Sequence, residues 1–346
     1  MSKPELSAFH KLSVTKLTKD FRDGTAVVPA SLPDTVPEGQ VYVRVLYVGV
    51  NATDINVTNG AYNKAAPPFD CGLEALGVVE KVASDVTHIS VNDHVLCIVF
   101  NAYAEYISVS HTACIKLPDD SPKYLVLAVS GLTAAIALGE LGNPCRGDVA
   151  LVTAAAGGTG QIAVQLLKHV YQCTVIGTCS SDDKADFLHS IGCDHTINYK
   201  TDDLNEKLTH YAPRGLNVIY ECIGGETYNT ALNHIAVGGR LVIIGSISTY
   251  KSGKEVAFNT PSGSSLQSHL IFRSASLRGF LLIHYRNKFV EYTKKLLEYT
   301  KENKLQLNVD KTATFFGLNS IADALDHLYS GKSFGKVVVK IQEQTS

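Results

Sequence analysis

The sequence predicts a two-domain α/β protein, in which a doubly wound parallel sheet is combined with a smaller β-rich domain. Three observations support this fold class. The first third of the chain is strand-like, the middle alternates strand-like with helix-like runs, and the tail resembles the first third again. A chain of 346 residues also usually divides its hydrophobic core between domains.

The β-rich domain is predicted from short apolar runs that are separated by turn residues. The strand candidates span residues 41–48, 77–82, 94–99 and 104–109. In the tail, a helix over 321–329 and a strand over 336–341 are expected to return to this domain. We therefore place residues 1–126 and 283–346 together in one discontinuous domain.

The doubly wound sheet is predicted over residues 127–282, where strands and helices alternate. Strands are expected at 149–153, 173–178, 218–221, 241–245 and 276–282, and helices at 161–171, 184–191 and 227–237. A long helix over 288–303 follows the last strand.

Composition excludes several classes of function. The net charge of −2 gives no field that would hold nucleic acid or an acidic membrane surface. No apolar run is judged to approach the roughly 20 residues of a membrane-spanning helix. We therefore expect no membrane role and a cytoplasmic location. The eight cysteines form no C-x-x-C pair, which favours free thiols in a reducing compartment.

The strongest motif is a glycine-rich turn between a predicted strand and a predicted helix. The strand over 149–153 runs into Ala-Ala-Ala-Gly-Gly-Thr-Gly, residues 154–160. Such glycines let the backbone approach a pyrophosphate, and the following helix offers unpaired N–H groups to it. We predict that Gly157, Gly158, Thr159 and Gly160 bind a dinucleotide; the alternative is a turn that only closes the strand–helix unit.

The residues after the second strand favour a dinucleotide with a 2′-phosphate. An NAD site usually has a carboxylate roughly 20 residues beyond the glycines. Here Cys179 occupies that position, and Ser180 and Lys184 can donate a hydrogen bond and a positive charge to a phosphate. NADPH is the predicted cofactor, provided that Asp182 and Asp183 point outward. The alternative for Lys184 is a solvated helix-surface lysine.

Three motifs together resemble the medium-chain dehydrogenase/reductase superfamily. They are Asn-Ala-Thr-Asp at 51–54, Gly-Leu-Glu-Ala-Leu-Gly at 72–77 and the glycine-rich loop. Zinc-dependent members carry a Cys in the first motif and a His in the second, where this chain has Asn51 and Leu73. The resemblance therefore implies a Rossmann domain, a GroES-like catalytic domain and an active-site cleft between them, without a metal.

Longer stretches are similar to the zinc-free quinone oxidoreductase and prostaglandin reductase branch of that superfamily. They cover residues 48–51, 67–70, 152–161, 176–182, 197–201 and 331–332. The resemblance implies NADPH-dependent reduction of the double bond of α,β-unsaturated ketones and aldehydes, including 15-oxo-prostaglandins, and a homodimer. Some members end in a peroxisomal tripeptide, whereas this sequence ends in Gln-Thr-Ser.

The resemblance also implies a set of cofactor-binding residues. Tyr199 joins Ser180 and Lys184 around the 2′-phosphate, with a loop tyrosine of no such role as the alternative. Cys222 and Ile244 are expected to line the path from adenosine to nicotinamide. The nicotinamide itself is expected to be covered by Phe280, Leu281 and Leu282 and reached from the tail by Ser333.

Tyr250 and Asn51 are the catalytic candidates. Hydride addition to the β-carbon of an enone leaves negative charge on the carbonyl oxygen, and a phenol hydroxyl can stabilise it and relay a proton. Tyr250 follows a predicted strand end; alternatively, it only packs on the cofactor. Asn51 can hold the nicotinamide ribose or the substrate carbonyl, or be a turn residue. Tyr62 is a weaker candidate for substrate binding.

Two rival functions remain open at this point. The first is a quinone oxidoreductase with the same fold and cofactor. The second is a non-catalytic NADPH-binding protein, as some lens crystallins of the superfamily are. The stretch 248–267, rich in Ser, Gly and Lys, is either a loop that covers a long substrate or a solvated surface loop.

Overall fold

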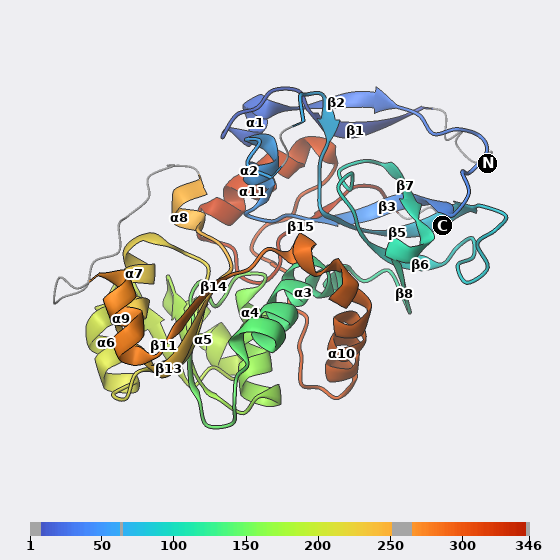
Figure 1. Ribbon diagram of the computed structural model, residues 1–346. Coiled ribbons are helices and arrows are strands. Elements are labelled where there is room, and N and C mark those ends of the chain that lie inside the picture. Colours follow the sequence, from blue (N-terminus) through green and yellow to red (C-terminus); the bar gives the residue numbers. More distant parts are fainter. Residues whose placement is uncertain (1–7, 63–64, 251–264, 344–346) are drawn as a thin grey trace. The chain divides into compact units, whose positions relative to one another are not determined.

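The protein is described by a computed structural model that covers residues 8–62, 65–250 and 265–343. Its contacts divide the chain into two compact units, one of Met1–Val129 with Val309–Ser346 and one of Ser130–Asn308. The first unit contains antiparallel sheets and the second a parallel sheet (Figure 1). The predicted fold class is therefore confirmed.

The main sheet of the first unit is organised around its longest strand, β3. This strand pairs with β7 near its beginning, with β15 near its end and with β5 along most of its length. Valines dominate β3, and most of its residues are buried. The strands of this sheet are β3 (Gln40–Gly49), β5 (Glu74–Val82), β6 (His94–Ile98), β7 (Tyr106–Ser110), β8 (Cys114–Leu117) and β15 (Val338–Lys340). The pairing of β15 with β3 confirms that the tail returns to the β-rich unit.

A smaller three-stranded sheet and three helices complete the first unit. The order of the small sheet is β2-β1-β4. These elements are β1 (Phe9–Val14), β2 (Thr25–Ala30), β4 (Phe69–Asp70), α1 (Phe21–Gly24), α2 (Asp54–Thr58) and α11 (Ile321–Tyr329). The hydrophobic core of the unit includes Phe9, Val45, Tyr103 and Leu325.

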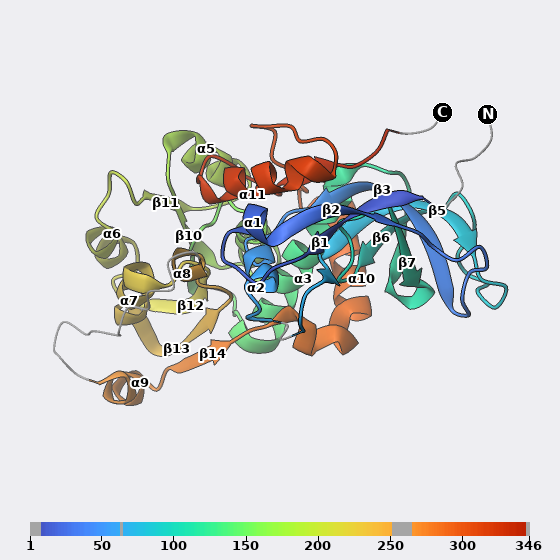
Figure 2. The same cartoon turned by 90° about the horizontal axis from the view of Figure 1, so that it is seen from above.

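The second unit is built on a six-stranded sheet in which every neighbouring pair is parallel, in the order β11-β10-β9-β12-β13-β14. Figure 2 shows β14 beside β13 at the edge of this sheet. The strands are β9 (Val149–Val152), β10 (Thr174–Cys179), β11 (His195–Asn198), β12 (Leu216–Glu221), β13 (Ile235–Ile243) and β14 (Ser276–Gly279). The order reverses direction beside β9, which is where such sheets bind ligands.

Helices connect the parallel strands. Leucines of α6, α7 and α9 pack with Leu151 and Ile219 of the sheet in one hydrophobic cluster, so these helices share a face. The helices are α3 (Val129–Ile136), α4 (Gly160–Gln165), α5 (Asp182–Ser190), α6 (Leu204–Tyr211), α7 (Gly225–Asn233), α8 (Ile247–Tyr250), α9 (Leu266–Arg273) and α10 (Phe289–Lys301). Single π-helical segments, Ala137–Gly142 and Leu166–Val170, prolong α3 and α4.

Several predicted boundaries in the sheet are wrong. The strand expected over 241–245 is β13, which already begins at Ile235 and ends at Ile243. The helix expected over 227–237 ends at Asn233, because Ile235 already pairs with Leu216 as the first residue of β13. The strand expected over 276–282 ends at Gly279, and a 3₁₀ segment, Leu282–Lys288, follows it.

The second unit extends further along the chain than the predicted limit at residue 282. Tyr292 of α10 donates to Glu140 at 2.7 Å, and the adjacent Gly139 leaves no room for a β-carbon beside the Tyr292 ring. The side-chain amide of Gln165 also donates to the Gln306 carbonyl and accepts from the Gln306 N–H. It thus pairs with the backbone of Gln306 in the way that a neighbouring strand would. These contacts place α10 with the parallel sheet and not with the β-rich unit.

One helical segment contradicts the expectation that no apolar run reaches spanning length. Residues Pro122–Gly142 have a mean hydropathy of 1.8 over the most apolar window of this 21-residue segment. Within the described chain, 72% of that window is buried inside the protein, which is typical of a core helix. The helix is thus long and apolar enough to span a membrane, but the same length and composition occur in the core helix of a globular protein.

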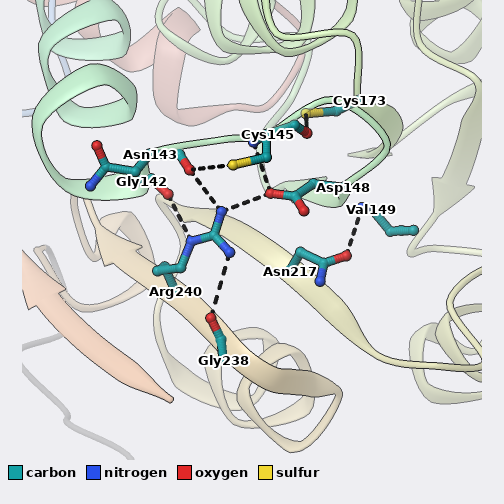
Figure 3. Close-up of polar contacts among 9 residues, drawn as sticks. All are labelled: Gly142, Asn143, Cys145, Asp148, Val149, Cys173, Asn217, Gly238 and Arg240. Carbon is teal, nitrogen blue, oxygen red and sulfur yellow. Dashed lines mark hydrogen bonds and ion pairs between the residues drawn. The ribbon is translucent and has the colours of Figure 1, made fainter. Parts of the chain in front are cut away.

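Arg240 of β13 joins three segments at the amino end of the parallel sheet (Figure 3). Its guanidinium donates to the carbonyls of Gly142 and Asn143 at 2.9 and 2.8 Å, and to Asp148 at 2.7 Å. Asn143 has a left-handed φ of 42° and ends the helix. Arg240 thus satisfies carbonyls that a helix end leaves without partners. Cys145, in the same loop, is one of eight cysteines, all of which are free thiols.

We expect Arg240→Met to lower the free energy of unfolding by about 2–4 kcal/mol, because Asp148 and two helix-end carbonyls lose their donor. Urea unfolding followed by circular dichroism measures the change. The control is Arg214→Met, at an exposed site, which should stay within about 0.5 kcal/mol of wild type. Equal effects of the two substitutions would show that Arg240 does not hold these segments together.

Candidate active site

The glycine-rich loop lies between β9 and α4, as predicted. At Gly160 a β-carbon would lie 2.7 Å from the Ala155 carbonyl oxygen, so only glycine fits at this first helical residue. Among the described residues, the N–H groups of Gly158, Thr159 and Gly160 donate no hydrogen bond. Three successive free donors at the start of a helix form a site for an anion such as pyrophosphate.

Thr159 contributes to this loop only through its backbone. Its hydroxyl lies 3.0 Å from the Ser130 carbonyl oxygen and 2.6 Å from the Tyr220 hydroxyl. Both contacts hold the loop against its own unit. The side chain is therefore occupied, and its N–H remains for a ligand.

The predicted 2′-phosphate residues gather at the carboxyl ends of β10 and β11. The N–H of Tyr199 donates to the Cys179 carbonyl at 3.1 Å, which places this tyrosine beside the segment that contains Ser180. Ser180 and Lys184 are buried, whereas Tyr199 is 53% exposed. Lys184 is therefore not the solvated surface lysine that was its alternative.

The two aspartates that follow Ser180 do point outward. Asp182 and Asp183 are both exposed in the first turn of α5, and Asp182 accepts a hydrogen bond from the Asn198 side chain at 3.1 Å. The expected conflict between these carboxylates and a phosphate is thus reduced.

Cys222 and Ile244 follow the ends of β12 and β13. The N–H of Cys222 donates to the Thr153 hydroxyl at 2.8 Å, and the N–H of Ile244 donates to the Glu221 carbonyl at 2.7 Å. Burial raises the pKa of the Cys222 thiol well above its usual range, so this residue remains a neutral thiol.

Glu221 organises the loop that contains Cys222. Its carboxylate is fully buried and accepts hydrogen bonds from the Thr153 hydroxyl and from the N–H groups of Ile223 and Gly224. Burial raises the pKa of Glu221, while these donors oppose that effect. The loop at the carboxyl end of β12 is therefore fixed by one buried acid.

Tyr250 lies at the end of α8, where its hydroxyl accepts a hydrogen bond from the Ser246 N–H at 3.1 Å. A β-carbon at Gly245 would lie 2.7 Å from the same hydroxyl, so a larger residue there would displace the Tyr250 side chain. The phenol is thus held at the carboxyl end of β13. Part of the predicted covering loop, 251–264, lies outside the described residues, and its flanks are helical as α8 and α9.

Phe280, Leu281 and Leu282 follow β14 at the same edge of the sheet. The N–H of Phe280 donates to the Ile243 carbonyl at 2.9 Å and continues the strand pairing. Its ring is buried and stacks on Tyr285 at a centroid distance of 5.0 Å. Leu281 and Leu282 are half-buried.

Asn51 belongs to a buried polar network in the first unit. Its side-chain nitrogen donates to Glu74 Oε1 at 2.9 Å, and its side-chain oxygen accepts from Lys336 Nζ at 2.7 Å. Lys336 also forms an ion pair with Glu74 Oε1. The second oxygen of Glu74 accepts from the Val129 N–H at 2.8 Å. Asn51 is therefore much more constrained than a turn residue would be.

A second buried acid lies next to this network. Asp54 Oδ2 accepts hydrogen bonds from the Asn51 N–H at 2.8 Å and from the Tyr103 hydroxyl at 2.6 Å. Its other oxygen, Oδ1, is buried and has no partner within the described part of the chain. Burial raises the pKa of Asp54 to about 7, so this acid is partly protonated at neutral pH.

Tyr62 and Ser333 also lie in the first unit. Tyr62 is exposed, and its N–H donates to the Asn56 carbonyl at 3.1 Å. Ser333 is half-buried, next to Phe334, whose N–H donates to Asp310 at 3.3 Å. The structure therefore brings the nucleotide candidates together in one unit and Asn51, Tyr62 and Ser333 in the other.

Comparison with known proteins identifies two family models in this chain. Residues 37–119 match the alcohol dehydrogenase GroES-like domain, and residues 158–298 match the zinc-binding dehydrogenase domain. A probable quinone oxidoreductase of Leishmania amazonensis is 56% identical and covers 99% of this chain and 100% of its own length. Prostaglandin reductase-3 of Mus musculus is 41% identical, over 97% of this chain and 90% of its own.

Solved structures show the same fold. A mycobacterial protein in complex with NADPH matches with a TM-score of 0.82 and 26% identity, over 96% of this chain and 99% of its own. Quinone oxidoreductase of Escherichia coli, also in complex with NADPH, matches with a TM-score of 0.82 and 23% identity, over 96% of this chain and 99% of its own.

The residues of this chain do not fit the zinc ion for which one family model is named. A catalytic zinc needs three Cys, His or carboxylate ligands. No group of three or more such side chains could hold a metal ion anywhere in the described ranges. The Lys336 ammonium beside Asn51 would also repel a cation.

Sequence reasoning missed five residues of the candidate site: Glu74, Lys336, Glu221, Asp54 and Tyr103. The available signal was a charged residue inside an apolar run, as in Val-Ile-Tyr-Glu at 218–221 and Lys-Val-Val-Val at 336–339. Such a residue in a predicted strand is usually buried only when it is paired.

Replacement of the second buried acid, by Asp54→Asn, should change how stability depends on pH. A raised pKa means that the folded protein keeps a proton that the unfolded chain has released, so Asp54 lowers stability as pH rises from about 4 to about 7. Between pH 5 and 8, wild type should lose about 2 kcal/mol more unfolding free energy than the variant. Urea titrations at both values test this, with the exposed Asp34→Asn as control. Parallel pH profiles of wild type and Asp54→Asn would contradict it.

Proposed function

Because this chain belongs to the medium-chain dehydrogenase/reductase superfamily, we propose that it reduces the carbon–carbon double bond of α,β-unsaturated ketones and aldehydes with NADPH. The observation that supports a dinucleotide most directly is the row of three free N–H groups at Gly158, Thr159 and Gly160. They lie at the end of the strand beside which the sheet order reverses.

The residues at the carboxyl ends of β10 and β11 support NADPH over NADH. Cys179 takes the place of a carboxylate that would repel a 2′-phosphate, and Ser180, Lys184 and Tyr199 surround that position. The path to the nicotinamide is proposed to be lined by Cys222, Ile244, Phe280, Leu281, Leu282 and Ser333. NADPH, when bound, supplies the hydride.

The chain's own contribution to the reaction is orientation and stabilisation of negative charge. Tyr250 is held by Ser246 and is proposed to donate a hydrogen bond, or a proton, to the carbonyl oxygen of the substrate. Asn51 is proposed to donate a second hydrogen bond to that oxygen. Tyr62 is proposed to contact the rest of the substrate.

A quinone is the second candidate acceptor. The 56% identical relative is named a probable quinone oxidoreductase, whereas the 41% identical relative is named a prostaglandin reductase. A third relative, (+)-pulegone reductase of Mentha piperita, is 29% identical. The site chemistry fits either acceptor, because both place negative charge on an oxygen after hydride transfer.

Steady-state NADPH oxidation with a 15-oxo-prostaglandin, a short enal and a quinone, each alone, tests the proposal. We expect kcat/KM to be at least about tenfold higher for an enone than for the quinone, which corresponds to roughly 1.4 kcal/mol of transition-state binding. The reverse order would favour the quinone oxidoreductase. Tight NADPH binding without turnover of any acceptor would favour a non-catalytic role.

Lys184→Met should raise the Kd for NADPH by about 10–100-fold, because a charged hydrogen bond to phosphate contributes roughly 1.5–3 kcal/mol. The Kd for NADH should change less than about twofold. Nucleotide fluorescence titration measures both constants, and Lys301→Met, at an exposed site on α10, is the control. Equal weakening of both nucleotides would place Lys184 outside the 2′-phosphate site.

A further inference from the structure

The Lys336 ammonium is buried in the first unit and contacts two side chains at once. It lies 2.7 Å from Asn51 Oδ1 and is paired with Glu74 Oε1, and the residue is 1% exposed. We propose that Lys336 is a positioning residue: its ammonium orients and polarises the Asn51 amide, so that the remaining amide N–H becomes a strong donor to the substrate carbonyl oxygen. This inference rests on the proposed function.

The network fixes which way the Asn51 amide points. An ammonium has only hydrogen-bond donors, so the atom that faces Lys336 must be the amide oxygen. The Glu74 carboxylate, when ionised, has only acceptors, so the atom that faces it must be the amide nitrogen. The two contacts agree with each other, and the opposite orientation would break both.

Only one of the two hydrogens on the Asn51 side-chain nitrogen is used in the contact with Glu74. The same ammonium contacts both Asn51 Oδ1 and Glu74 Oε1, so the hydrogen on the same side as Oδ1 faces Glu74. The second hydrogen points away from the ion pair, and among the described residues it has no acceptor. Asn51 as a whole is 9% exposed, so its amide lies in a mostly buried environment.

The ion pair has almost no freedom to move. A β-carbon at Gly49 would lie 2.6 Å from Glu74 Cδ and 2.7 Å from Lys336 Cε, so both side chains are packed on the bare backbone of β3. Glu74 is further held by the Val129 N–H, and the Asn51 N–H by Asp54. A rigid donor costs no reorganisation when charge develops on a substrate.

The charge of Lys336 acts through the amide. A positive charge beside the oxygen of an amide withdraws electron density from the amide nitrogen and so strengthens the N–H as a donor. The low dielectric of the protein interior enlarges this effect. Glu74 balances the charge of Lys336, so the pair can be buried. A purely structural ion pair would have the same burial but no effect on the reaction through Asn51.

A double-mutant cycle in kcat separates these two roles. The variants are Asn51→Ala, the double variant Glu74→Gln with Lys336→Met, and the triple variant. Removing both charges avoids leaving an unpaired buried carboxylate, which would unfold the protein. The matched control is Arg44→Met with Glu80→Gln, which removes another ion pair of the same unit at 2.8 Å.

We expect the double variant and Asn51→Ala each to lower kcat by about 10–100-fold, with KM for the acceptor and Kd for NADPH changed less than about threefold. The triple variant should be no slower than Asn51→Ala, because Lys336 acts through that amide. The control should lose thermal stability and keep its kcat. Additive effects in the triple variant, or an unchanged kcat in the double variant, would overturn the inference.

The test distinguishes this inference from the proposed function. If wild type reduces the quinone and no enone, the proposed acceptor is wrong, and the same cycle is run with the quinone. If wild type is active and the cycle is additive, only the role of Lys336 is wrong. Wild type that reduces no acceptor would overturn both.

Discussion

The Glu74 carboxylate is the group on which the first unit depends. It joins residues that are far apart in sequence: Asn51 after β3, Lys336 before β15 and the N–H of Val129 at the start of α3. A carboxylate without accessible surface is tolerated only when a cation and several donors compensate for its lost hydration. The position of the candidate donor Asn51 is therefore a consequence of how one buried charge is neutralised.

The second unit follows a different constraint, the alignment of parallel strands. Their carboxyl ends meet at one edge, and the loops that follow them bring the glycine turn, Ser180, Tyr199 and Cys222 into one unit. Buried acids then fix individual loops, as Glu221 does beside Cys222. In each unit, the backbone geometry thus brings the candidate site residues together, and a buried polar network then fixes their positions.

The fold class could be predicted from the sequence because apolar periodicity and glycine turns are local signals. Boundaries were less accurate where pairing with a distant strand decides them. Ile235 is strand and not helix because it pairs with Leu216, and α10 belongs with the parallel sheet because Tyr292 packs on Glu140. A contact between residues about 150 positions apart leaves no local pattern.

The glycine loop was predictable for the same local reason, whereas the network around Asn51 was not. Lys336 and Asn51 are separated by 285 positions, and a single lysine beside a valine run resembles the end of a surface strand. The contact between the Thr159 hydroxyl and the Tyr220 hydroxyl could not be predicted either, because Tyr220 lies far away in sequence, on β12. Long-range pairing decided each case.

The pairing of β15 with β3 has a consequence for synthesis on the ribosome. Residues 130–308 emerge before the last strand, so the parallel sheet has all of its strands while the N-terminal sheet still lacks one. Until translation reaches Lys336, Glu74 has no counter-ion, and its burial is unfavourable. The buried environment of Glu74 can therefore form only after Lys336 has been synthesised, so the N-terminal sheet is completed after the parallel sheet has all of its strands.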